Sequence, residues 1–101
     1  MTVKLVVLYT EPADPAGFDR YYFDTHMPLV ASIPGLLRAE TGRVTAAVDG
    51  GEVSYYRMAE LYFADNESMN AGFGSPEGIA TAKDYGQIAP PGSRMFALNV
   101  D

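Results

Sequence analysis

The segment from Val3 to Tyr9 constrains the fold more than any other part of the chain. It is rich in β-branched, aliphatic and aromatic residues, and the pair Glu11-Pro12 follows it, a pattern that predicts a strand. Its odd-numbered positions are apolar, and so are Val6 and Leu8 on the opposite face. A strand that is apolar on both faces has to be covered on both sides.

A long helical segment is predicted to follow this strand. Asp14-Pro15 is typical of a helix start, because Asp caps the free N–H groups and Pro is favoured at the first helical position. Three residues spaced by four share one helical face: Phe18, Tyr22 and His26. Pro28 lacks an N–H and clashes with the preceding turn, so we expect a kink near His26-Met27-Pro28. Pro34-Gly35 is expected to end the helix.

Two strands are predicted next, one over 36–48 with a possible bulge at Gly42 and one over 54–63. Asp49-Gly50-Gly51 is expected to form the turn between them. A second helical region, capped by Asp65 or Asn66, is interrupted at 72–76. It restarts at Ser75-Pro76 and is expected to reach Tyr85 or Ile88, and Met95–Val100 is predicted as the last strand.

The resulting order β-α-β-β-α-β predicts a single α+β domain over residues 1–101 with a ferredoxin-like fold, in which both helices cover one face of an antiparallel sheet. The first strand and the third, however, carry apolar residues on both faces. The uncovered face would be a large exposed apolar patch, which monomers rarely tolerate. We therefore expect a homodimer in which two sheets pack face to face.

Composition narrows the possible partners. Seven basic and thirteen acidic residues give a net charge of −6, and the basic residues are scattered, which argues against nucleic acid and against an anionic membrane surface. The absence of Cys excludes disulfides, thiol catalysis and Cys-ligated metals. The apolar start is too short for a signal peptide, and no run is long enough for a membrane span. We expect a cytoplasmic protein that binds a small molecule.

His26 is the only histidine and the best candidate for proton transfer. Imidazole is the side chain whose ordinary pKa lies near neutrality, and a general acid or base needs such a group at a cavity. The competing interpretation is a structural histidine that binds carbonyls at a helix end. Asp24 is not expected to orient the ring, because residues two apart do not share a helical face.

The seven tyrosines suggest a ligand pocket, because each has an apolar ring and a polar hydroxyl. Four of them are the candidate substrate-binding tyrosines: Tyr9, Tyr21, Tyr22 and Tyr85. The alternative is ordinary packing in a core and a dimer interface. Arg57 is a further candidate ligand-binding residue, on the opposite face of its strand from Glu60, and a solvated edge position is its alternative.

No cofactor or metal is expected from these residues. The chain has neither a Gly-rich phosphate loop nor a nucleophile elbow, and one His without Cys cannot form a common zinc site. Haem with His26 as axial ligand is chemically possible, but the sequence does not select it.

The chain resembles the EthD family over nearly its whole length. The residues that carry the resemblance are Tyr9, Pro12, Asp14, Phe18, Tyr21-Tyr22, His26-Met27-Pro28-Leu29, Pro34-Gly35-Leu36, Phe63-Ala64-Asp65, Ser75-Pro76-Glu77-Gly78 and Asp84. Met27 departs from the small β-branched residue that is common in His-x-Pro-Leu, and it leaves the motif intact. The resemblance implies a dimeric α+β barrel. It matches the family histidine to His26 and the family tyrosine to Tyr21 or Tyr22.

The superfamily that this resemblance implies includes cofactor-free monooxygenases, muconolactone isomerases, methylmuconolactone methylisomerase and haem-dependent members. We therefore predict an enzyme of bacterial degradative or secondary metabolism that uses His26, without a cofactor, for proton transfer, isomerisation or oxygenation of a small aromatic or lactone-like substrate. The alternative is a non-catalytic metabolite-binding or accessory homodimer. A ring nitrogen free at a cavity favours the enzyme, and an imidazole saturated by backbone carbonyls favours the alternative.

Overall fold

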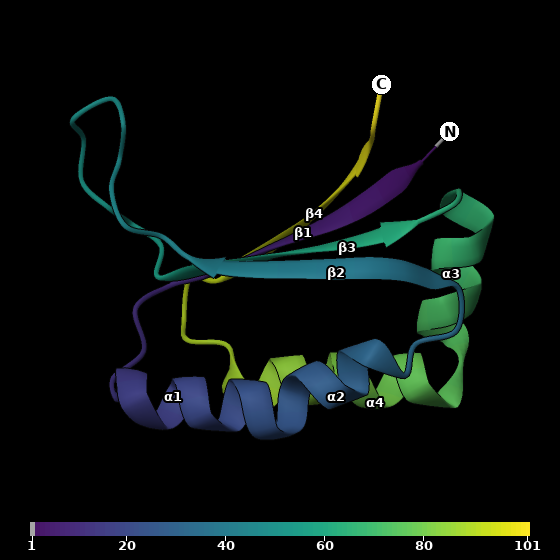
Figure 1. The fold of residues 1–101 in the computed structure, drawn as a ribbon. Helices are drawn as coiled ribbons and strands as arrows, with labels where there is room; N and C mark the ends of the chain where they lie inside the picture. The colour runs from purple at the N-terminus through teal and green to yellow at the C-terminus, as the bar shows by residue number, and fades with distance from the viewer. Residues whose placement is uncertain (1) are drawn as a thin grey trace.

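The structure is a computed structural model that describes residues 2–101. Its strands form one antiparallel sheet in the order β2-β3-β1-β4, with helices on one side (Figure 1). The bounds of the strands are β1 Val3–Tyr9, β2 Leu36–Arg43, β3 Arg57–Phe63 and β4 Arg94–Asn99. The predicted ferredoxin-like α+β arrangement is thus confirmed.

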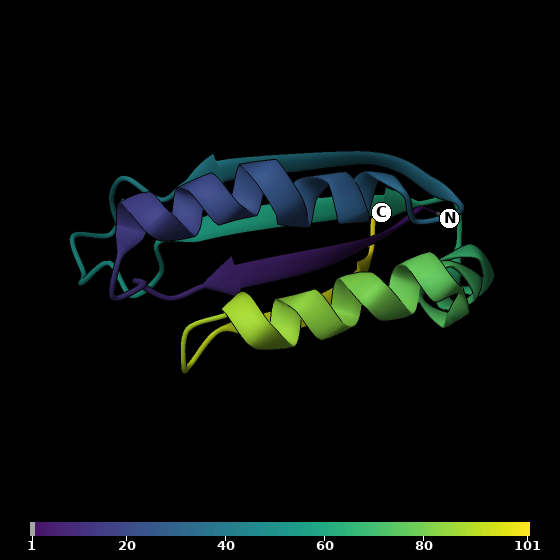
Figure 2. The same cartoon turned by 90° about the horizontal axis from the view of Figure 1, so that it is seen from below.

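Two helical stretches connect the strands. The first runs from β1 to β2 and consists of α1 (Pro15–Tyr21), the π-helical segment η1 (Tyr22–His26) and α2 (Met27–Ala31). The second runs from β3 to β4 and consists of α3 (Asn66–Gly74) and α4 (Pro76–Ile88). Figure 2, seen from the helix side, shows the first stretch in front of β2 and β3 and α4 in front of β4, with β1 visible between the two stretches.

The predicted helix caps are confirmed. Asp14, Asp65 and Ser75 each accept a hydrogen bond from the backbone N–H three residues further on, so that α1, α3 and α4 begin where their side chains satisfy free donors. Proline stands at the start of both α1 and α4, where its missing N–H costs no helical bond.

The first helical stretch has a wide turn where a kink was expected. The N–H of Met27 bonds to the carbonyl of Tyr22, five residues back, immediately before Pro28. Because the ring of a helical proline collides with the carbonyl four residues back, a widened turn is a physical way to admit Pro28. The stretch also ends earlier than expected, at Ala31, where the Ser32 hydroxyl donates to the Leu29 carbonyl at 2.6 Å.

Three strand boundaries were predicted wrongly. β2 ends at Arg43, β3 begins only at Arg57, and β4 spans Arg94–Asn99, one residue earlier than expected. Residues 44–56 form a coil that rises on the side of the sheet away from the helices (Figure 1). The base of the coil is packed, since Tyr56 is buried, but Val48 at its tip is fully exposed, so no packing favours strand pairing there.

The expected bulge at Gly42 is also wrong. The register between β2 and β3 shifts between Leu36 and Arg38, which leaves Leu37 as the extra residue. Gly42 itself is paired with Met58 in the regular ladder.

The core lies between the sheet and the helices. Alternate residues of β3 are buried there, as the pleat of a strand requires. The core side chains include Val7 and Tyr9 from β1, Ala59, Leu61 and Phe63 from β3, and Tyr22, Val30 and Ile33 from the first helical stretch.

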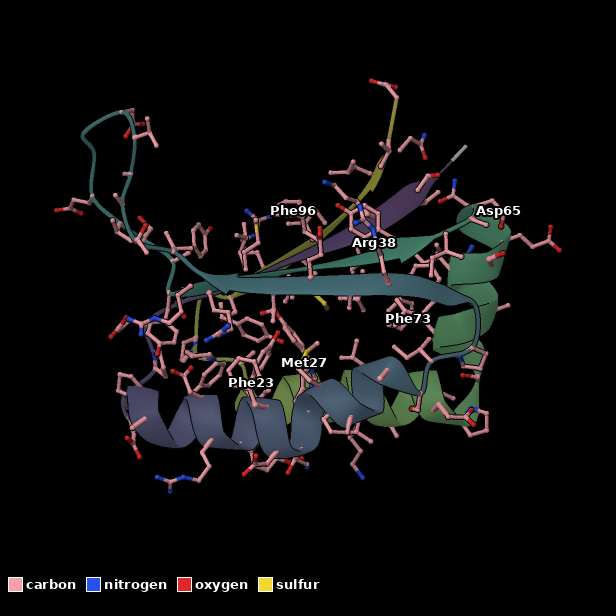
Figure 3. All side chains as sticks on the ribbon, viewed as in Figure 1. Phe23, Met27, Arg38, Asp65, Phe73 and Phe96 are labelled. Carbon is pink, nitrogen blue, oxygen red and sulfur yellow. The ribbon has the colours of Figure 1, made fainter. Side chains whose placement is uncertain are left out.

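The other side of the sheet, here called the open face, is not covered by a helix. The pleat and the strand registers place six apolar residues on it: Val6, Leu8, Met58, Tyr62, Phe96 and Leu98. Phe96 is 41% exposed, and Figure 3 shows Phe96 and Arg38 on this side. The pairs Lys4–Glu60 and Arg38–Glu40 add charge to the same face. No helix within residues 2–101 is long and apolar enough to cross a membrane.

Candidate functional site

A cavity of about 210 Å³ lies between the sheet and the helices. Its floor is formed by side chains of the three strands β1, β3 and β4, among them Leu5, Leu61 and Met95. Its other walls come from η1, α2, α3 and α4, and Figure 3 shows Met27 and Phe73 between the layers. Nearly all of the lining is apolar, so the cavity suits a small, uncharged ligand.

His26 lies in the wall of this cavity at the end of η1. The residue is only 4% exposed, and its Nδ1 lies 2.8 Å from Oδ2 of Asp84 on α4. A carboxylate oxygen can only accept, so Nδ1 carries the hydrogen and donates it. The neutral ring then has its lone pair on Nε2. The ring of Tyr22 stacks against the imidazole at 5.6 Å between centroids and holds its plane.

The hydroxyl of Tyr9 faces Nε2 at 3.4 Å. This separation is longer than an ordinary hydrogen bond from a hydroxyl, so the lone pair on Nε2 is only weakly engaged. Tyr9 is buried among the rings of Phe18, Tyr22 and Tyr85. Burial, followed by the charges of neighbouring groups, raises the pKa of Tyr9, and burial also raises the pKa of Tyr22, so both remain neutral phenols.

Asp84 has a second partner. Its Oδ1 accepts a hydrogen bond of 2.6 Å from the hydroxyl of Tyr21. Each oxygen of this carboxylate therefore has one donor, and the side chain is only 7% exposed. This bond to Asp84 is the main reason that the pKa of Tyr21 is raised.

Arg57 lies in a separate polar cluster beside the cavity. Its Nη2 donates to Asp19 and its Nη1 to Thr41, each at 3.3 Å, and its guanidinium lies over the rings of Tyr22 and Phe23. Its Nε is buried without a partner among residues 2–101. The hydroxyl of Tyr22 is directed to Thr41 at 3.0 Å, and therefore toward this cluster.

The structure places the four predicted tyrosines near His26 and Asp84, but it places Arg57 outside the cavity lining. Tyr22 and Tyr85 line the cavity with His26. Tyr9 is outside the lining and faces Nε2 of His26, and Tyr21 donates to Asp84. Arg57 is not part of the cavity lining. The roles of these residues in catalysis and ligand binding stay predictions.

Sequence reasoning from side-chain chemistry missed Asp84 as the partner of His26. Asp24, the acidic residue close by in sequence, is exposed. A signal was available on α4, where Thr81, Tyr85 and Ile88 follow helical spacing on the inner side. An aspartate at position 84, within that stripe, is a buried charge that requires a partner.

The site does not fit a protein-bound metal ion. Within the described part of the chain, no group of three or more His, Asp and Glu side chains is placed to hold a metal ion. Both ring nitrogens of His26 already face protein groups, Asp84 on one side and Tyr9 on the other. An axial bond from Nε2 to haem iron would have to displace the Tyr9 hydroxyl.

Comparison with known proteins identifies relatives of the whole chain. A curated relative, an uncharacterized 11.0 kDa protein of the thcB–thcC intergenic region of Rhodococcus erythropolis, is 38% identical over 93 residues, which cover 92% of this chain and 89% of the relative. The crystal structure of an ethyl tert-butyl ether D (EthD) family protein from Bacillus halodurans C-125 matches with a TM-score of 0.92 and 36% identity, over 100% of both chains.

More distant solved structures share the fold alone. Hydroxynitrile lyase from Passiflora edulis has a TM-score of 0.81 at 12% identity, with 99% of this chain and 94% of that chain covered. SnoaB, a cofactor-independent oxygenase from Streptomyces nogalater, has a TM-score of 0.71 at 18% identity, covering 98% and 92%. A dimeric protein of unknown function with a ferredoxin-like fold, from Bacteroides fragilis, has a TM-score of 0.66 at 14% identity, covering 98% and 96%.

The EthD domain model matches residues 10–90, which include η1, His26 and Asp84. Together with the relative that is 38% identical over 92% of the chain, this match shows that the chain belongs to the EthD family.

Proposed function

We propose that this protein is a small-molecule enzyme of bacterial degradative or secondary metabolism that transfers a proton with His26 as general base and without a cofactor. The observation that carries the proposal is the buried His26–Asp84 pair in the wall of an apolar cavity. An enzyme needs a base in a fixed tautomer beside a space for substrate; the pair fixes the tautomer, and the cavity supplies the space. The fold is also used by a cofactor-independent oxygenase and a hydroxynitrile lyase.

The chemistry follows from the tautomer. Asp84 holds the hydrogen on Nδ1, so Nε2 is the atom that accepts a proton from a carbon next to a carbonyl group, once the Tyr9 hydroxyl at 3.4 Å turns away from it. The imidazolium that forms is stabilised by the adjacent carboxylate. Tyr22 directs its hydroxyl to Thr41, which leaves Tyr85 as the cavity phenol to donate to the developing oxyanion. Return of the proton to another carbon would complete an isomerisation.

The lining indicates the kind of substrate. Charged side chains are absent from the cavity wall described here, so an anionic substrate would be desolvated there without a counterion. Met27, Met69 and Met95 contribute flexible thioethers that adapt to flat rings. A small, neutral aromatic or lactone-like molecule is the substrate class that this cavity favours.

The general base can be tested with 5-nitrobenzisoxazole, a flat neutral carbon acid whose ring opens to a coloured phenolate when a base removes its C–H proton. We expect wild-type protein to accelerate the reaction, and His26→Gln to lower kcat/KM by about 10²-fold or more, as loss of a general base does. Asp24→Asn, an exposed change two residues away, is the matched control and is expected to keep the wild-type rate. Equal rates for His26→Gln and wild type would refute the proposal.

A non-catalytic binding role is the second candidate, and one observation favours it. The Tyr9 hydroxyl faces Nε2, so both ring nitrogens have a protein neighbour in the empty site. This alternative predicts that a neutral aromatic probe binds in the cavity and perturbs the His26 ring resonances. It also predicts that His26→Gln opens 5-nitrobenzisoxazole at the same rate as wild type.

We further propose that the protein is a homodimer that buries the open face. No helix of residues 2–101 covers the six apolar residues of that face, and a solved structure of the same fold is described as dimeric. Sedimentation at micromolar concentration is expected to give a dimer for wild type and a folded monomer for Phe96→Glu, because Phe96 is 41% exposed in the single chain. A wild-type monomer would refute this proposal.

A further inference from the structure

Tyr21 is unusual because its ring is half exposed while its hydroxyl reaches a buried group. The residue is 40% exposed, yet its hydroxyl lies 2.6 Å from Oδ1 of Asp84, which is itself only 7% exposed. The other oxygen of the same carboxylate accepts from Nδ1 of His26. Tyr21 is therefore outside the cavity lining, and its hydroxyl bonds to Asp84, the α4 residue that holds the imidazole.

The wide turn of η1 explains how two residues of one helix reach the same carboxylate. Tyr21 and His26 are five residues apart, and on an α-helix they would point about 140° apart. In η1 the hydrogen bond from Met27 to Tyr22 spans five residues, so each residue turns the chain through a smaller angle. Both side chains then meet Asp84 on α4. A regular α-helix would direct one of them away.

The carboxylate needs such an anchor to orient the ring. An aspartate can rotate about its last side-chain bond, and a rotated carboxylate presents a different oxygen and a different angle to Nδ1. A short bond from Tyr21 to Oδ1 fixes this rotation and leaves Oδ2 aimed at Nδ1. We propose that Tyr21 is a positioning residue, which holds Asp84 so that His26 keeps its hydrogen on Nδ1 and its lone pair on Nε2. The catalytic meaning of this assignment rests on the proposed function, but the geometry can be tested without turnover.

The test is the tautomer of His26, measured from the ¹⁵N shifts of the ring nitrogens in protein labelled at histidine. With one histidine in the chain, the signals need no assignment by mutagenesis. We expect the neutral ring of wild type to be mainly the Nδ1–H form. In Tyr21→Phe, the ratio of the Nδ1–H to the Nε2–H form is expected to fall roughly fivefold, the equilibrium effect of losing one ordinary hydrogen bond.

Tyr56→Phe is the matched control. Tyr56 also donates to a carboxylate, Asp19, at 2.7 Å, but this pair lies outside the contacts of His26. The control variant is expected to leave the tautomer ratio unchanged. An unchanged ratio in Tyr21→Phe, or an equal change in both variants, would overturn the assignment.

A measurement on wild-type protein covers the case in which Tyr21→Phe does not fold. The bond to Asp84 raises the pKa of Tyr21, so its phenol is expected to titrate above the ordinary value of about 10. An ordinary pKa for Tyr21 would show that the bond is absent and would overturn the assignment. The ring opening of 5-nitrobenzisoxazole tests His26 as a general base, and the tautomer ratio tests Tyr21 as a positioning residue. A tautomer change in Tyr21→Phe supports the role of Tyr21 even if wild type shows no turnover.

Discussion

Replacing Asp84 with Asn separates the charge of this residue from its shape. The amide keeps the size of the side chain, but it has one acceptor and one donor where the carboxylate had two acceptors. Asp84 accepts two short bonds, 2.6 Å from Tyr21 and 2.8 Å from His26. In Asp84→Asn one of these bonds has to reverse its direction, and reversal at His26 would place the hydrogen on Nε2.

The effect on stability can be estimated from the two bonds. A hydrogen bond to a charged group contributes about 1.5–3 kcal/mol and a neutral one about 0.5–1.5, so two replacements lose roughly 2–3 kcal/mol. A neutral amide costs less to bury than a carboxylate, which reduces the expected net loss to about 1–2 kcal/mol. For a domain of this size, that loss corresponds to a decrease in Tm of roughly 5–15 °C.

Urea unfolding of wild type, Asp84→Asn and Asp24→Asn is the assay. Both variants remove one negative charge, but Asp24 is exposed, so only Asp84→Asn is expected to lose stability. With 5-nitrobenzisoxazole, Asp84→Asn is expected to lose about 10²- to 10⁴-fold in kcat/KM, because the base is in the wrong tautomer. Equal stability of the two variants would refute the reasoning about the buried carboxylate, and unchanged kcat/KM would refute its role in orienting the ring.

Three further predictions concern packing and pH. In Gly78→Ala the new Cβ would lie 2.1 Å from the carbonyl oxygen of Gly72, so the free energy of unfolding is expected to fall by about 1–3 kcal/mol. Gly86→Ala, on the same helix α4, meets open space and is expected to raise this free energy by about 0.5–1 kcal/mol; thermal unfolding measures both. Phe63→Ala removes a fully buried ring from the core and is expected to cost about 3–5 kcal/mol in urea unfolding, and a cost below 1 kcal/mol would contradict the burial described here. Because burial raises the pKa of Tyr9, the folded chain keeps a phenol proton that the unfolded chain releases. Stability is therefore expected to fall above pH of about 10, with Tyr9 alone contributing up to about 1.4 kcal/mol per pH unit, so the decline is expected to be less steep in Tyr9→Phe; an identical slope would contradict this cause.

The fold was predictable because its signals are local. Caps such as Asp14 and Ser75 act on N–H groups within a few residues, and the alternation along β3 reports burial directly. The coil over 44–56 was not predictable in the same way. Its valines favour a strand, but pairing depends on what packs against them, and Val48 has no neighbour to bury it.

The candidate site was predictable only in part. His26 stands out as the single histidine, and Tyr22 shares its helical face. Asp84 lies 58 residues further along the chain, and only the packing of α4 against η1 brings the two together. In the π-helical turn the backbone N–H bonds to the carbonyl five residues back instead of four. The pattern of side chains along the sequence does not distinguish these two kinds of turn.

The central claim is that His26 exchanges a proton with a small neutral molecule in the cavity. The most direct measurement is incorporation of deuterium from D₂O at the γ-carbon of a simple butenolide lactone, followed by NMR for wild type and His26→Gln. The account predicts incorporation by wild type above the buffer rate, reduced about 10²-fold or more in His26→Gln. Binding of the lactone by wild type with incorporation no faster than in His26→Gln would contradict it.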